Sequence, residues 1–220
     1  MKIKVGIIDD DKSKTTQIMT KLIQGLDDAS PEKKEKYSHY EFEPIEVELL
    51  DDVSSMVGSI KELGIDCAII DYKLSSYQTV NFSGVELAKA IEREFYEFPI
   101  FILTSYDDDL FSKEVYNAYQ IFDFDRYLSE KKERIELNFK LIEQVLKTQK
   151  QKENWNLQLK KLLPLAGTSE EIDSAILDLD SKIEKSTDGR HALPEKLKKD
   201  LSSNKLSELI DKIDEILEEE

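Results

Sequence analysis

The chain has 220 residues, a net charge of −16 and a hydrophobic content of 40%. This length accommodates one sizeable domain with an appendage, or two small domains. The acidic excess disfavours binding to nucleic acid and to anionic membranes, since both require basic surface.

Strand and helix patterns alternate over the first two thirds of the chain. Short apolar runs indicate strands, and apolar residues at helical spacing between them indicate helices. The expected strands are residues 3–8, 41–50, 65–71, 99–103 and 125–129, and the expected helices are 13–26, 51–63, 85–95 and 110–119, with a polar loop at 27–40. Such alternation predicts parallel strands joined by crossover helices. We therefore expect an α/β domain over residues 1–148, built on a doubly wound five-stranded parallel sheet.

A small all-α region is predicted to follow, over residues 149–220. A helical pattern begins at Lys131 and runs toward Leu162, where Pro164 and Gly167 interrupt it. Amphipathic helices are expected around 172–183, 194–201 and 205–217, and their apolar stripes must bury against one another, the first domain or a partner. The polar middle of the long helix fits either an exposed linker helix or a dimer seam.

The cysteine content and the lack of a long apolar run indicate a cytoplasmic protein. Cys67 is the single cysteine, so no internal disulfide framework can form, which suits a reducing compartment. No apolar run approaches the roughly 20 residues that cross a bilayer. The N-terminal residues lead directly into a predicted strand, without signal-peptide features. We therefore expect no membrane contact.

Acidic and hydroxyl residues follow three of the predicted strands. Asp9 and Asp10 follow the first strand, Asp71 the third and Thr104 the fourth. The carboxyl ends of parallel strands converge at one edge of a sheet. Each close carboxylate pair there costs about 4 kcal/mol at an effective dielectric of about 20, so such a site keeps a proton or binds a hard cation. Mg²⁺ fits, because it takes few carboxylates and pairs with phosphoryl oxygens. The competing interpretation is that the acids only cap helices.

This ordered set of residues resembles the receiver domain of two-component response regulators. The resemblance is carried by Ile7-Ile8-Asp9-Asp10-Asp11, Ile69-Ile70-Asp71, Gly84, Ile102-Leu103-Thr104-Ser105 and Tyr127-Leu128. It implies a flavodoxin-like fold in which Asp71 accepts a phosphoryl group from the phosphohistidine of a histidine kinase. Such a protein is not a conventional enzyme, because it catalyses only its own phosphorylation and dephosphorylation, and it signals through protein contacts.

The resemblance also implies roles for the neighbouring residues. Asp10 would bind Mg²⁺ directly, Asp9 would bind it mainly through water, and the backbone carbonyl of Lys73 would supply a further ligand. Thr104 would move toward the phosphoryl group, and Tyr127 would change rotamer with it as the switch residue.

The sequence departs from this family at the fifth strand. Receivers carry a lysine there, followed by proline, and alignment from Tyr127 puts Glu130 at the lysine position and Lys131 at the proline position. Either the strand is shifted and Lys131 serves as the catalytic lysine, or the lysine is absent. The loops before Gly84 and before the second strand are also longer than is usual in the family.

Two other functions fit part of the pattern. A pseudo-receiver would keep the fold and act as an interaction module without phosphorylation, which the glutamate at 130 favours. A haloacid-dehalogenase-type phosphatase would use the Asp9-x-Asp11 spacing, with Thr104 or Ser105 as its second motif, but it leaves Asp71 without a role. A DNA-binding output is disfavoured because the tail is acidic and lacks a basic recognition helix. The expected partners are therefore a histidine kinase and a protein partner, or a second copy, bound through residues 131–220.

Overall fold

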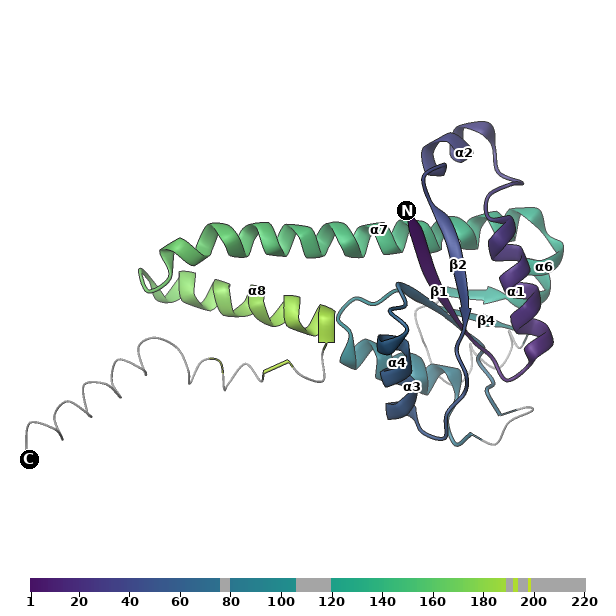
Figure 1. Cartoon of the computed structure of the whole chain (residues 1–220), viewed down its shortest axis with the longest axis horizontal. Coiled ribbons are helices and arrows are strands. Elements are labelled where there is room, and N and C mark those ends of the chain that lie inside the picture. The colour runs from purple at the N-terminus through teal and green to yellow at the C-terminus, as the bar shows by residue number, and fades with distance from the viewer. Residues whose placement is uncertain (76–79, 106–119, 189–191, 194–197, 199–220) are drawn as a thin grey trace, which may run out of the picture. The chain divides into compact units, whose positions relative to one another are not determined.

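The computed structural model of the chain describes residues 1–75, 80–105, 120–188, 192–193 and 198. The chain divides into two compact units, Met1–Gln149 and Lys150–Glu220. Three predicted helices, at 110–119, 194–201 and 205–217, fall wholly or almost wholly outside the described residues. The element labels used below are those of Figure 1.

The first unit contains a five-stranded sheet with the strand order β2-β1-β3-β4-β5. All four strand pairings are parallel. The strands are β1 (Lys2–Ile8), β2 (Glu41–Glu46), β3 (Cys67–Ile70), β4 (Ile100–Thr104) and β5 (Ile121–Asp123). The predicted α/β class with a doubly wound parallel sheet is thus confirmed. Pro44 lies in β2, an edge strand, where a residue without an N–H is tolerated.

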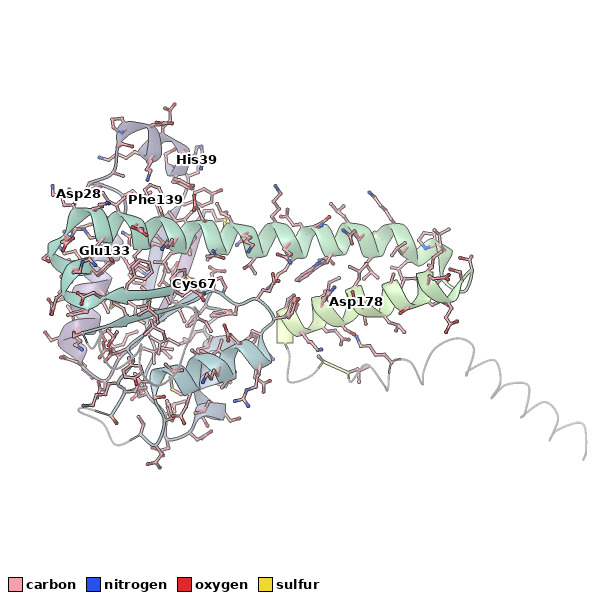
Figure 2. All side chains as sticks on the ribbon, turned by 180° about the vertical axis from the view of Figure 1, so that it is seen from behind. Asp28, His39, Cys67, Glu133, Phe139 and Asp178 are labelled. Carbon is pink, nitrogen blue, oxygen red and sulfur yellow. The ribbon has the colours of Figure 1, made fainter. Side chains whose placement is uncertain are left out.

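Helices follow the strands along the chain and cover both faces of the sheet (Figure 1). They are α1 (Lys12–Gln24), α2 (Pro31–Tyr37), α3 (Val53–Glu62), α4 (Gly84–Glu94), α6 (Phe124–Ser129) and α7 (Lys131–Leu162). Side chains of a strand alternate between its faces, so each inner strand contributes to two cores. In β3, Ala68 and Ile70 pack with α3 and α4, whereas Cys67 and Ile69 pack with α1, α6 and α7. This two-sided burial explains the continuous apolar run of β3, in which Cys67 is fully buried (Figure 2).

The predicted fifth strand at 125–129 is wrong. The strand lies earlier, at Ile121–Asp123, and residues 124–129 form α6. The Asp123 side chain accepts a hydrogen bond of 2.6 Å from the Arg126 N–H and so caps the helix. This cap allows α6 to begin directly after β5, a strand of only three residues.

The predicted polar loop at 27–40 also contains a short helix, α2. Pro31 is its first residue, a position where the missing N–H costs nothing. Tyr37 anchors the helix: its hydroxyl donates a hydrogen bond of 2.7 Å to Glu143, and its ring lies 5.0 Å from that of Phe139. Both partners belong to α7, so this anchor depends on contacts between residues far apart in the sequence.

In the second unit, the C-terminal part of α7 is followed by the short 3-10 helix η2 (Leu163–Leu165) and by α8 (Glu170–Asp188). The Lys152 ammonium donates a hydrogen bond of 2.7 Å to the Ser186 carbonyl, which joins α7 to α8 near the end of α8. Lys198 forms ion pairs with Asp180, at 2.5 Å, and Glu184, at 2.8 Å. Within the described part of the chain, no helix is both long enough and apolar enough to span a bilayer.

Candidate functional site

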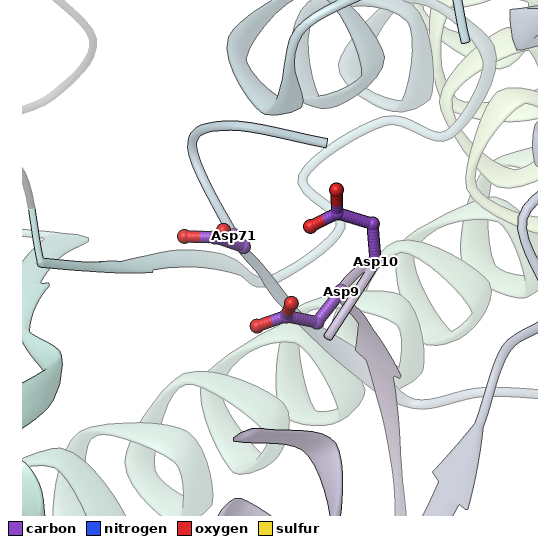
Figure 3. A group of neighbouring side chains, drawn as sticks. All are labelled: Asp9, Asp10 and Asp71. Carbon is purple, nitrogen blue, oxygen red and sulfur yellow. The ribbon is translucent and has the colours of Figure 1, made fainter. Parts of the chain in front are cut away.

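Three carboxylates meet at the carboxyl edge of the sheet. Asp9 and Asp10 directly follow β1, and Asp71 directly follows β3; each offers an oxygen, and these oxygens lie within 4.8 Å of one another (Figure 3). The two strands are neighbours, and the Asp71 N–H donates a hydrogen bond of 2.8 Å to the Ile8 carbonyl. The parallel ladder therefore sets the spacing of the three acids.

Burial makes the charged state of this cluster costly. Asp10 and Asp71 are only 5% and 4% exposed. Burial, opposed by Lys14 and reinforced by the charge of Asp10, raises the pKa of Asp71 to about 6. Burial also raises the pKa of Asp9 to about 7, although a hydrogen bond of 2.7 Å from the Asp11 N–H favours its ionised form. Without a cation, the cluster therefore retains protons at pH values where an exposed carboxylate is fully ionised.

One oxygen of Asp71 has no hydrogen-bond partner among the described residues. This oxygen, Oδ1, is buried. Buried carboxylate oxygens are normally satisfied, so such an atom is a specific feature of the site. Oxygen ligands held together by a parallel ladder suit Mg²⁺.

Lys14 pairs with the other oxygen of Asp71. Its Nζ atom lies 3.7 Å from Asp71 Oδ2, and its side chain is 21% exposed. Sequence reasoning missed this residue, although a signal was present. Asp11 caps α1, with its side chain accepting hydrogen bonds from the N–H groups of Ser13 and Lys14. A lysine in the first turn of a helix opposes the helix dipole and so suggests a nearby acid. The turn contains both Lys12 and Lys14, and only the structure shows which of them lies beside Asp71.

Gly84 allows the backbone of Asp71 to take its position. A Cβ atom at residue 84 would collide with the Asp71 carbonyl oxygen. The Gly84 N–H donates a hydrogen bond of 2.9 Å to the Tyr72 carbonyl, and Ser83 and Glu86 form a capping box at the start of α4. Residue 84 must therefore be glycine, because the backbone of Asp71 lies too close to leave room for a Cβ atom.

Thr104 and Lys73 lie along the same edge. Thr104 ends β4, which pairs with β3, and it is fully buried. Lys73 lies two residues after Asp71 in the connection to α4, and its side chain is exposed. The role of Thr104 at a phosphoryl group and that of the Lys73 carbonyl at a metal remain predictions.

The structure does not support Lys131 as a residue of this site. Lys131 begins α7, and its Nζ atom lies 2.9 Å from Asp28 Oδ1, with the side chain 73% exposed. Asp28 follows the C-terminal end of α1 and lies beside the first turns of α7 (Figure 2). Since α1 has 13 residues, that end is roughly 20 Å from the end that carries Lys14. Hydrogen bonds from Lys131 and Arg134 lower the pKa of Asp28 to about 2.

Glu130 and Tyr127 have structural environments that differ from those expected. Glu130 follows α6 and forms an ion pair of 3.3 Å with Arg126. Tyr127 lies in α6 and is fully buried, and its hydroxyl donates a hydrogen bond of 3.4 Å to the Asn138 side chain. The alignment from Tyr127 therefore fails, because these residues do not lie in the fifth strand. The last residue of that strand is Asp123, which pairs with Thr104, so its end carries an acid.

Comparison with known proteins found no matching family model and no matching curated protein. One similar solved structure is the anti-anti-sigma factor PhyR from Bartonella quintana, with 14% identity and a TM-score of 0.40 over 70% of this chain. This chain covers 51%, about half, of the PhyR chain. Another contains the yeast Spc42 trimeric coiled coil, amino acids 181–211, in a fusion. It has 17% identity and a TM-score of 0.40, and the match covers 81% of this chain and 91% of the fusion.

Proposed function

We propose that this protein is a receiver-like signalling protein that accepts a phosphoryl group on Asp71 from a histidine kinase in a Mg²⁺-dependent reaction. The observation that carries the proposal is the Asp71 side chain. It is almost fully buried, it adjoins two further carboxylates, and one of its oxygens has no hydrogen-bond donor among the described residues. This is the environment expected of a nucleophile that shares a metal with its neighbours.

In the proposed reaction, an Asp71 carboxylate oxygen attacks the phosphorus of a phosphohistidine. A new oxygen–phosphorus bond forms, the phosphorus–nitrogen bond breaks, and its electron pair stays on the imidazole, which then takes up a proton. Asp10 and Asp71 would hold Mg²⁺ directly and Asp9 through water, with the Lys73 carbonyl as a further ligand. The bound metal would neutralise charge on the transferring group and orient it in line. The Thr104 hydroxyl would donate a hydrogen bond to a phosphoryl oxygen.

The proposal is tested by incubating the full-length protein with Mg²⁺ and a small phosphodonor such as acetyl phosphate. We expect an acyl phosphate that borohydride trapping and mass spectrometry assign to Asp71, and no modification in an Asp71→Asn variant. Asp11→Asn is the matched control. An asparagine side chain still caps α1, so this variant should react like the wild type.

Either of two outcomes would reject the proposal. Absence of an acyl phosphate on the wild type with both a small donor and a kinase would leave a non-phosphorylated pseudo-receiver. This alternative is favoured by one specific observation, the acid at the end of β5. Modification of Asp9 would indicate a haloacid-dehalogenase-type phosphatase, a reading that the structure disfavours because Asp11 caps α1.

We also propose that the protein signals through protein–protein contacts rather than by binding nucleic acid. Helix α7 begins in the unit that carries the site and continues into the second unit. Residues 131–220 would therefore contact a protein partner or a second copy of the chain.

A further inference from the structure

A phosphoryl group on Asp71 would bring more negative charge into a cluster that already holds three carboxylates. A divalent metal offsets only part of that charge, so a protein cation in contact with the phosphoryl oxygens would stabilise the product. The end of β5, where the resemblance predicts a lysine, carries Asp123. The predicted substitute, Lys131, forms its ion pair with Asp28 at the opposite end of α1.

Lys14 has the position that such a cation requires. Its Nζ atom is 3.7 Å from Asp71 Oδ2, which is longer than a hydrogen bond but within the range of an ion pair. The same ammonium group lies 5.3 Å from the centre of the Phe124 ring. Because Phe124 directly follows β5, Lys14 lies between the end of β3 and the end of β5. An ammonium group of α1 therefore reaches the region in which a β5 lysine was expected.

The local structure of α1 supports a functional role for this lysine. It lies in the first turn of the helix, where the dipole disfavours a positive charge, and unlike the exposed Lys12 of the same turn it is half-buried beside a carboxylate. Its side chain is mostly buried between an aromatic ring and a carboxylate. Among the described residues, Asp71 is an acidic contact of this lysine.

We propose that Lys14 is the residue whose ammonium group contacts the phosphoryl group on Asp71, in place of the lysine expected at the end of the fifth strand. This inference rests on the proposed function, because it assigns a second residue to the same phosphorylation site. It goes beyond that function by moving the phosphoryl-binding cation from β5 to the first turn of α1.

The test measures two ligands separately. Beryllofluoride, a non-covalent mimic of the aspartyl phosphate, is titrated in the presence of Mg²⁺, and Mg²⁺ alone is titrated by calorimetry. A lysine that contacts the phosphoryl group helps beryllofluoride binding but competes with the metal for the carboxylates. We therefore expect Lys14→Gln to weaken beryllofluoride binding about tenfold or more, which is the size of a lost charge-assisted hydrogen bond. The same variant should bind Mg²⁺ about threefold or more tightly.

Three further variants complete the test. Lys14→Arg keeps the charge and should recover most of the beryllofluoride affinity. Lys12→Gln removes an exposed lysine from the same helical turn, and it should change either affinity by less than about twofold. Lys14→Met retains packing against Phe124 and replaces the glutamine variant if that one does not fold.

The outcomes separate this inference from the proposed function. If the wild type binds beryllofluoride and Lys14→Gln binds it equally well, Lys14 has no phosphoryl contact but the proposed function stands. Loss of both affinities in Lys14→Gln would indicate that the lysine only orders the site, and it too would overturn the inference. If the wild type neither binds beryllofluoride nor forms an acyl phosphate, both proposals are wrong.

Discussion

Replacing Asp71 by asparagine should stabilise the metal-free protein, although the residue is buried and ion-paired. The shape of the side chain is kept and its negative charge is removed. The pKa of Asp71 is raised from 3.8 to about 6, so ionising this carboxyl in the folded protein costs about 3 kcal/mol. Asp9, whose pKa is raised to about 7, stays largely neutral while Asp71 ionises. At an effective dielectric of about 20, the remaining Asp10 carboxylate within 4.8 Å repels Asp71 by about 3.5 kcal/mol, and Lys14 at 3.7 Å attracts it by about 4.5 kcal/mol. These charge interactions largely cancel, and burial accounts for the remaining cost.

The sign of the pH dependence follows from the raised pKa. Between about pH 4 and pH 6 the folded protein keeps a proton on Asp71 that the unfolded chain releases, so wild-type stability falls as pH rises through this range. The asparagine variant lacks this contribution. We therefore expect the two proteins to be similarly stable at about pH 4, and the variant to be more stable by about 2–3 kcal/mol at about pH 7.5 in chelator.

Urea unfolding at several pH values, with chelator or with Mg²⁺, measures this difference. Mg²⁺ should stabilise the wild type more than the variant and reduce the gap between them. Asp27→Asn, at an exposed position, is the control for removing one negative charge from an acidic protein, and it should show a small effect at every pH. A variant less stable than the wild type at neutral pH, or a gap that does not change with pH, would refute the reasoning.

Four further substitutions test the site and the packing of α6 and α7. Gly84→Ala places a Cβ against the Asp71 carbonyl oxygen, so it should lower the free energy of unfolding by about 3 kcal/mol and abolish stabilisation by Mg²⁺; a fully stable variant with normal metal binding would contradict the close approach. Arg134→Met removes a side chain that is 8% exposed and donates to two backbone carbonyls of α6; urea unfolding should show a loss of about 2–4 kcal/mol. Lys131→Met is its matched control, because this lysine pairs with the same aspartate but is 73% exposed, and a loss above about 1 kcal/mol would be unexpected. Tyr127→Phe removes one long hydrogen bond and should change stability by less than about 1 kcal/mol, with beryllofluoride binding unchanged; loss of that binding would restore a switch role for Tyr127.

The sequence by itself determined the parallel sheet except for its fifth strand, and the three-carboxylate cluster. The apolar run before Asp71 is a local pattern, and its burial on both faces follows from the alternation of strands and helices along the chain. The carboxyl ends of parallel strands share one edge of the sheet. Asp9 and Asp10 are therefore expected beside Asp71 from the strand order along the sequence alone. The pattern also indicated Gly84, but only the structure shows that Gly84 makes room for the Asp71 carbonyl.

Only the tertiary structure decided where the fifth strand ends and which cation lies beside Asp71. Ile121–Asp123 is too short for periodicity to indicate a strand, and the cap formed by Asp123 converts the following residues to helix. The sequence therefore suggested Lys131, which is adjacent to the expected strand but pairs at the far end of α1. Lys14 is 57 residues away from Asp71 in the chain, and α2, β2 and α3 lie between α1 and β3. Their contact therefore arises only when α1 packs beside β3 and α6. Local patterns encode the burial of each element, whereas the pairing of charges between elements depends on how the elements pack.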